Sequence, residues 1–193
     1  MRQVRYNYLH EIVKIVNPSS IIEIGIAMGK NAEAMLKINP SVKYTGYDVF
    51  DTVDYKFQKA AGNTKEVSAK ADIQNKLNKI ASDVTLHEGK TEDTLWEKGD
   101  KADLVWLDGD HRLESIIKDY EAVKDSGVIV FDDYYVTEKH AGFNRSEYGC
   151  YEMFYDDPDV LISPETIDWG HIRIAVKCDD PVMHAKIKEL FDE

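Results

Sequence analysis

The stretch Ala102-Asp-Leu-Val-Trp-Leu-Asp-Gly-Asp-His111 is an apolar run that ends abruptly in two carboxylates and an imidazole. Its centre, residues 104–107, is continuously apolar, which predicts a strand covered on both faces, as in a parallel sheet. Ligands of open α/β sheets bind outside the carboxyl ends of the strands. We therefore expect Asp108, Asp110 and His111 to lie where binding or catalysis takes place.

A second run, Gly127-Val-Ile-Val-Phe-Asp-Asp133, repeats this pattern of a buried strand that ends in acids. Because the carboxyl ends of parallel strands meet at one edge of a sheet, Asp132 and Asp133 are expected beside Asp108. Two strands delivering carboxylates to one edge is the strongest functional indication in the sequence.

Strand and helix patterns alternate along the chain, which predicts a doubly wound α/β fold with a parallel sheet. After the fifth strand this regular alternation ends, and a short helix and a two-strand hairpin on the sheet edge are expected. Residues 49–64 are polar and aromatic and are expected to form a loop or lid. The expected strands are 21–25, 43–48, 83–87, 104–108 and 128–131, then 160–162 and 172–176; the expected helices are 8–16, 28–37, 73–80, 91–96, 113–120 and 148–155.

Composition limits the function classes. With 193 residues, 43% of them hydrophobic, the chain suits one domain spanning residues 1–193. It has no apolar run approaching the ~18 residues of a transmembrane helix and no signal-like start, so a cytoplasmic protein without membrane contact is expected. Its formal net charge of −12 disfavours nucleic acid as a partner. Cys150 and Cys178 are expected to be reduced.

The segment Glu23-Ile-Gly-Ile-Ala-Met-Gly29 lies where the first strand should turn into a helix. Glycine allows positive φ there and lets a ligand approach the backbone. Ala27 stands where a dinucleotide fingerprint has its second glycine, which disfavours a dehydrogenase. Asp48, at the end of the second strand, could accept hydrogen bonds from both hydroxyls of a ribose. A helix cap or solvated turn acid is the alternative for Asp48.

Five motifs, taken in order, resemble class I S-adenosylmethionine-dependent methyltransferases. They are Glu23-x-Gly25-x-x-x-Gly29, Asp48, Glu88-Gly89, Asp108-Gly-Asp-His111 and Val130-Phe-Asp-Asp-Tyr134. The resemblance is to the Asp-Gly-Asp-His group, which includes metal-dependent sugar O-methyltransferases and is related to catechol O-methyltransferase. It covers roughly residues 18 to 135. It implies a Rossmann-like, mostly parallel seven-stranded sheet with an antiparallel C-terminal strand, in agreement with the expected hairpin.

The resemblance implies that S-adenosylmethionine is the cofactor. Its methionine part would lie along the turn from Gly25 to Gly29, with Glu23 steadying the turn and the amino group. Asp48 would hold the ribose, and the segment after the third strand would lie beside the adenine. The implied cofactor-binding residues are Glu23, Gly25, Gly29, Asp48, Gly89, Lys90, Thr91 and Asp108.

Asp108, Asp132 and Asp133 match the positions that hold a divalent cation in the metal-dependent relatives. Carboxylates at neighbouring strand ends repel one another, and a hard cation with oxygen ligands relieves this repulsion. Magnesium would suit such a site and would act as a Lewis acid on the acceptor hydroxyl. The alternative, as in metal-free relatives, is that Asp132 caps a turn and Asp133 is solvated.

His111 corresponds to the proposed general base of the resembling sugar methyltransferases, and Asp110 is the competing base. A structural role, fixing the turn into the next helix, is the alternative for His111. Substrate recognition is expected from the segment after Asp133, whose aromatic and polar side chains could hold a sugar or an aryl ring or, alternatively, pack the end of the sheet. Its residues are Tyr134, Tyr135, Lys139, His140, Phe143, Asn144 and Arg145, with Trp169 in a later loop.

The sequence thus predicts a methyltransferase that moves a methyl group from S-adenosylmethionine to a hydroxyl of a small molecule, a sugar or a catechol-like ring, with the help of a divalent metal. A metal-free methyltransferase is the nearest alternative. A non-catalytic S-adenosylmethionine-binding accessory protein is the alternative from another class. A homo-oligomer is left open.

Overall fold

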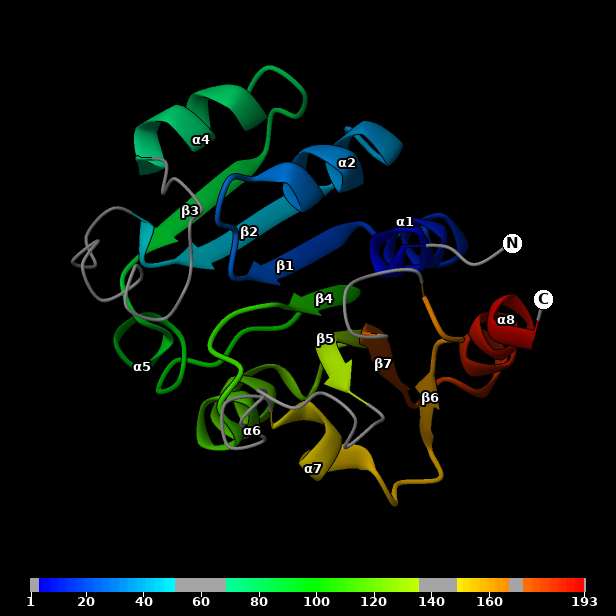
Figure 1. Ribbon diagram of the computed structural model, residues 1–193. Helices are drawn as coiled ribbons and strands as arrows, with labels where there is room; N and C mark the ends of the chain where they lie inside the picture. The colour runs from blue at the N-terminus through cyan, green and yellow to red at the C-terminus, as the bar shows by residue number, and fades with distance from the viewer. Residues whose placement is uncertain (1–3, 51–68, 136–148, 167–171, 193) are drawn as a thin grey trace.

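A seven-stranded sheet with helices on both faces forms the fold (Figure 1). The computed structural model describes residues 4–50, 69–135, 149–166 and 172–192. The strands are β1 (Ser20–Ile24), β2 (Lys43–Asp48), β3 (Val84–Glu88), β4 (Leu104–Leu107), β5 (Val128–Tyr135), β6 (Val160–Ile162) and β7 (Ile172–Cys178). The helices are α1 (Arg5–Val16), α2 (Lys30–Ile38), α4 (Lys70–Leu77), α5 (Thr91–Thr94), α6 (Leu113–Val123), α7 (Cys150–Phe154) and α8 (Pro181–Asp192).

The strand order is β3-β2-β1-β4-β5-β7-β6. Strands β1 to β5 pair in parallel, and β7 runs antiparallel to both β5 and β6. The predicted doubly wound sheet with an antiparallel C-terminal strand is confirmed. The order reverses between β1 and β4, and such a switch point opens a crevice at the carboxyl ends of the two strands.

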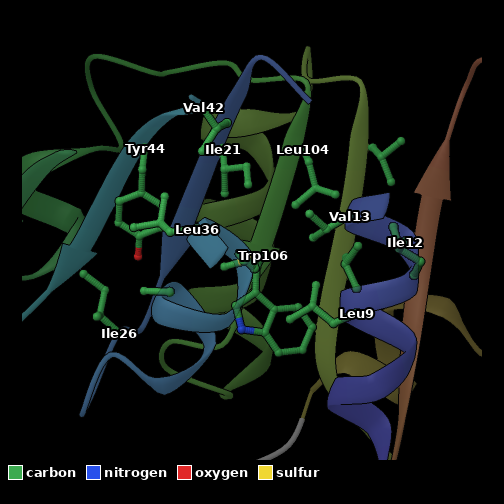
Figure 2. Packing of buried hydrophobic residues seen from close by; sticks show 14 of the residues in the cluster. Leu9, Ile12, Val13, Ile21, Ile26, Leu36, Val42, Tyr44, Leu104 and Trp106 are labelled. Carbon is green, nitrogen blue, oxygen red and sulfur yellow. The ribbon is translucent and has the colours of Figure 1, made fainter. Parts of the chain in front are cut away.

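Two apolar clusters cover the two faces of the sheet. Helices α1, α2, α4 and α8 contribute to one, and α6 and α7 contribute to the other. Figure 2 shows the first cluster, in which Leu9, Ile12 and Val13 of α1 lie beside Leu104 and Trp106 of β4. These three α1 side chains are completely buried, so α1 is anchored firmly on this face.

Strand β5 extends four residues beyond the expected end at Phe131. The extension pairs with β7, and the register shifts between Phe131 and Tyr134, where a β-bulge forms. Asp133 lies in this bulge with φ +55°, a left-handed conformation that aspartate tolerates better than most residues. The acids that were expected to follow the strand therefore lie within it.

Helix α8 was not expected from the sequence. It begins at Pro181, and the Asp180 carboxylate accepts the backbone N–H groups of Val182 (2.8 Å) and Met183 (3.2 Å). An aspartate before a proline at the first helical position is a start signal that could have identified it.

Part of the sequence prediction lies outside the described residues. This applies to most of the expected lid and to the recognition residues Lys139, His140, Phe143, Asn144, Arg145 and Trp169. None of the described helices combines the length and the apolar character that a membrane span requires.

Candidate active site

The turn after β1 lies directly against the end of β4. Gly25 has φ +86°, and a Cβ atom at this position would lie 1.9 Å from the carbonyl oxygen of Asp108. The Asp108 N–H donates to the carbonyl of Ile24 (2.8 Å), and the Gly25 N–H donates to the carbonyl of Tyr47 (2.9 Å). Only glycine fits here, because any side chain would push the turn away from β4.

The Asp48 carboxylate holds this turn in shape. It accepts the backbone N–H groups of Ile26 (2.6 Å) and Ala27 (2.7 Å), and also that of Phe50 (2.7 Å). These bonds to the Asp48 side chain support the left-handed backbone of Ala27, with φ +48°. Asp48 therefore orders the predicted cofactor turn, and contact with a ribose remains a prediction.

Glu23 lies beneath the turn, with its residue surface only 1% exposed. Its carboxylate accepts the hydroxyl of Tyr44 at 2.5 Å. Burial raises the pKa of Glu23 to about 8, although the Tyr44 hydrogen bond opposes this shift. This position agrees with a role in steadying the turn, and a contact with the cofactor amino group remains a prediction.

The segment after β3 lies beside Asp48, as the adenine-side prediction requires. The Gly89 N–H donates to the backbone carbonyl of Asp48 at 3.0 Å. Thr91 is partly buried, whereas the Lys90 side chain is exposed and pairs with Glu92 at 2.9 Å. The side chains of Thr91 and Lys90 thus have different surroundings, and their contacts with the cofactor remain predictions.

The predicted carboxylates do gather at one edge of the sheet, around His111. The Nε2 atom of His111 lies 3.6 Å from Oδ1 of Asp108 and 3.3 Å from Oδ2 of Asp133. Burial and the negative charges of Asp132 and Asp133 hold the pKa of Asp108 well above its usual value. The cluster therefore favours a proton on Asp108 and has an imidazole between two of its acids.

Arg5, at the start of α1, is distant from this cluster in the sequence but contacts it in the fold. Its Nε atom donates to Oδ1 of Asp132 at 2.6 Å, and its Nη2 atom donates to Oδ2 at 3.1 Å. The same Nη2 atom lies 3.5 Å from Oδ1 of Asp133. This two-pronged ion pair spans 127 positions of the chain, and nothing in the local sequence predicted it.

The arrangement does not fit the predicted magnesium site. Within the part of the chain that the structure describes, no group of three or more His, Cys, Asp or Glu side chains could hold a metal ion. Asp132 is buried and directed at Arg5, and Asp133 lies in the bulge with its side chain only 10% exposed. Neither the predicted metal site nor the alternative of a turn cap beside a solvated acid describes these residues.

Asp110 forms a different ion pair, with Arg112. Its carboxylate accepts the guanidinium of Arg112 and, at 2.9 Å, the hydroxyl of Ser115. Burial raises the pKa of Asp110, but the bonds from Arg112 and Ser115 outweigh burial and leave this pKa below its usual value. Of the two candidate bases, Asp110 is therefore the less suited, because its carboxylate is already engaged and its pKa is lowered.

A small pocket lies among the end of β4, the segment that follows it, α6 and β5. It is lined by Leu107, Gly109, Asp110, His111, Ile116, Asp119, Phe131 and Asp132. The predicted substrate residue Tyr134 is buried and packs against Tyr151, with ring centroids 5.5 Å apart, and Tyr135 is partly exposed at the end of β5. The third, Arg145, lies outside the described residues.

A profile of the family described as "Methyltransferase domain" matches residues 22–134, which include the glycine turn, Asp48, His111 and the carboxylate cluster. A search of curated proteins finds no match.

Several solved structures share the fold at low sequence identity. An O-methyltransferase from Bacillus cereus in complex with SAH has a TM-score of 0.62 at 16% identity, covering 90% of this chain and 80% of its own. Rv0187 from MTB, bound to cofactor, has a TM-score of 0.61 at 17% identity, with 88% and 78% covered. The O-methyltransferase TomG from Streptomyces achromogenes, in complex with SAM, has a TM-score of 0.59 at 16% identity, with 90% and 78% covered.

The buried carboxyl of Glu23 makes the stability of the chain depend on pH. Its pKa is about 8 in the folded chain, against a usual value of 4.5, so the folded chain binds this proton more tightly than the unfolded chain does. Between these values, raising the pH costs up to about 1.4 kcal/mol of unfolding free energy per pH unit. Glu23→Gln keeps an acceptor for Tyr44 and cannot ionise. We expect the variant to gain stability relative to wild type from about pH 6 to about pH 8, measured by urea denaturation.

The matched control is Glu33→Gln. Two lysines hold the pKa of Glu33 below its usual value, so this residue stays ionised in both states over that pH range. The unfolding free energy of Glu33→Gln should therefore change with pH as that of wild type does, at a constant difference. If the unfolding free energies of Glu23→Gln and wild type changed with pH in parallel, this would contradict the burial of an ionisable carboxyl under the turn.

Proposed function

The chain belongs to the methyltransferase-domain family, and we propose that it transfers a methyl group from S-adenosylmethionine to a hydroxyl group of a small molecule. The observation that carries this proposal is the packing of the glycine turn against the end of β4, a few residues before His111. A cofactor on the turn and a proton acceptor beside it would then lie at the same strand ends. We also propose that residues 1–193 form one such domain, since both apolar clusters share a single sheet.

The residues present fit the cofactor. The turn from Gly25 to Gly29 offers backbone without a Cβ atom at either end, and Asp48 fixes the turn from below. S-adenosylmethionine, when bound, supplies a methyl group on a sulfonium that leaves as a neutral thioether. The protein itself contributes by positioning the acceptor, so that the acceptor oxygen lies in line with the methyl carbon.

His111 is the proposed base. As the acceptor oxygen forms its bond to the methyl carbon, the hydroxyl proton passes to a ring nitrogen of His111. The imidazolium that results is stabilised by the Asp133 carboxylate, 3.3 Å from Nε2 in the resting arrangement. Asp110 is less suited to this role because its carboxylate already accepts bonds from Arg112 and Ser115.

The acceptor proposed is a sugar or a catechol-like ring. In support, the tyrosines Tyr134, Tyr151 and Tyr155 form a row beside the end of β5, with successive ring centroids 5.5 and 5.8 Å apart. The outermost of them, Tyr155, is 63% exposed. Aromatic faces of this kind stack on sugar rings and on aryl rings.

The reaction could proceed with or without a divalent metal, and the Arg5–Asp132 ion pair favours the metal-free version. A guanidinium bonded to both oxygens of Asp132 leaves this acid poorly placed to accept a divalent cation as well. We therefore assign no step to magnesium, and the sequence prediction of a magnesium-assisted reaction is the alternative.

The role of His111 predicts a specific loss of turnover. We expect His111→Gln to lower kcat by about 10²- to 10⁴-fold, because glutamine cannot accept the proton. Asp110→Asn should have a much smaller effect. The measurement is transfer of labelled methyl from S-adenosylmethionine to a panel of catechols and glycosides. Activity that survives His111→Gln but not Asp110→Asn would reverse the assignment, and binding without methylation of any acceptor would favour an accessory protein.

The metal-free version predicts that chelation leaves the reaction unchanged. With any acceptor found in that panel, the initial rate should be the same before and after exhaustive EDTA treatment. Added magnesium should not raise this rate, because no described step needs a Lewis acid. A rate that falls with EDTA and returns with magnesium would instead establish the magnesium-assisted reaction.

A further inference from the structure

A cation of the chain itself, the guanidinium of Arg5, lies against the carboxylate cluster of Asp108, Asp132 and Asp133. The guanidinium of Arg5 meets both oxygens of Asp132 and also lies 3.5 Å from Oδ1 of Asp133. The Asp132 side chain is fully buried and that of Arg5 is only 15% exposed. This planar fork matches the two oxygens of a carboxylate, so the pair is specific as well as strongly charged.

The β-bulge in β5 makes this contact possible. In a regular strand, Asp132 and Asp133 would point to opposite faces of the sheet. Because the register shifts after Phe131 and Asp133 adopts a positive φ, both carboxylates come within 3.5 Å of the same guanidinium. The backbone at this point is therefore shaped to present two acids to one cation.

The position of Arg5 is fixed by the packing that follows it in α1. Nη2 of Arg5 donates to the Tyr6 hydroxyl at 2.8 Å, and the guanidinium carbon lies 4.4 Å from the centre of the Tyr6 ring. The Tyr6 ring meets Trp106 of β4 edge-on, with centroids 6.1 Å apart. Leu9 and Ile12, one and two turns later, are completely buried. Moving Arg5 out of the cluster would disturb this packing.

We propose that the Arg5 guanidinium is the resident cation of the cluster of Asp108, Asp132 and Asp133, occupying the place that a divalent ion would otherwise take. Arg5 is thereby a positioning residue. It holds Asp132 and Asp133 in place, and Asp133 in turn contacts His111. The proposal deepens the proposed function and rests on it for the role of His111, but its test measures cation binding and needs no acceptor.

The test is a titration of the full chain with Mn²⁺, followed by the loss of the free-ion EPR signal. Wild type should bind no Mn²⁺ that depends on the cluster. Arg5→Gln should create one new site, about tenfold or more tighter than any background binding, because oxygen-rich acids without a cation attract a hard metal. Arg5→Lys, which keeps the charge, should suppress that site.

The matched control is Lys14→Gln, on the same helix. It removes one positive charge from an exposed pair with Glu11 and leaves the cluster untouched. It should behave as wild type. The proposal is overturned if Arg5→Gln gains no more Mn²⁺ affinity than Lys14→Gln. It is also overturned if wild type already binds a Mn²⁺ that Asp133→Asn removes, and this second comparison decides the matter should Arg5→Gln fail to fold.

Discussion

The close approach of two backbones, at Gly25 and Asp108, is the constraint on which the site depends. The space for a Cβ atom at Gly25 is already filled by the carbonyl of Asp108, and the two segments are joined through the bond from the Asp108 N–H to the carbonyl of Ile24. This contact places the glycine turn at the strand end that carries His111. Asp48 then secures the turn from the β2 side. This approach therefore brings the turn close to His111, the proposed base.

Electrostatic balance is the second requirement. Carboxylates that gather at a buried edge must be neutralised, and the chain does this with its own groups. Asp132 has Arg5, and Asp108 has a raised pKa that favours its neutral form. Asp110 lies nearer the surface, where it pairs with the exposed Arg112. The same repulsion between carboxylates leads from the sequence to a predicted magnesium ion. In the fold, the packing of α1 on the sheet brings the Arg5 guanidinium to these acids instead.

How far the sequence could predict this structure depends on the range of each interaction. Asp108 and Asp133 could be placed together because parallel strands end at a common edge, a rule that needs only the strand pattern. The contact of Arg5 with Asp132 could not be predicted, because the two residues are 127 positions apart in the sequence. It depends on how α1 packs on the sheet. The extension of β5 was missed for a similar reason, since pairing with β7 creates it. Helix α8 had a local signal at Asp180 and Pro181, and could have been predicted.

The central claim is that the glycine turn binds an adenosyl cofactor beside His111. Isothermal titration calorimetry with S-adenosylhomocysteine tests it most directly, with NADH as the control ligand. The account predicts one saturable site for S-adenosylhomocysteine and none for NADH, because Ala27 replaces the second glycine of a dinucleotide fingerprint. Absence of S-adenosylhomocysteine binding at millimolar concentration, or saturable binding of NADH instead, would contradict it.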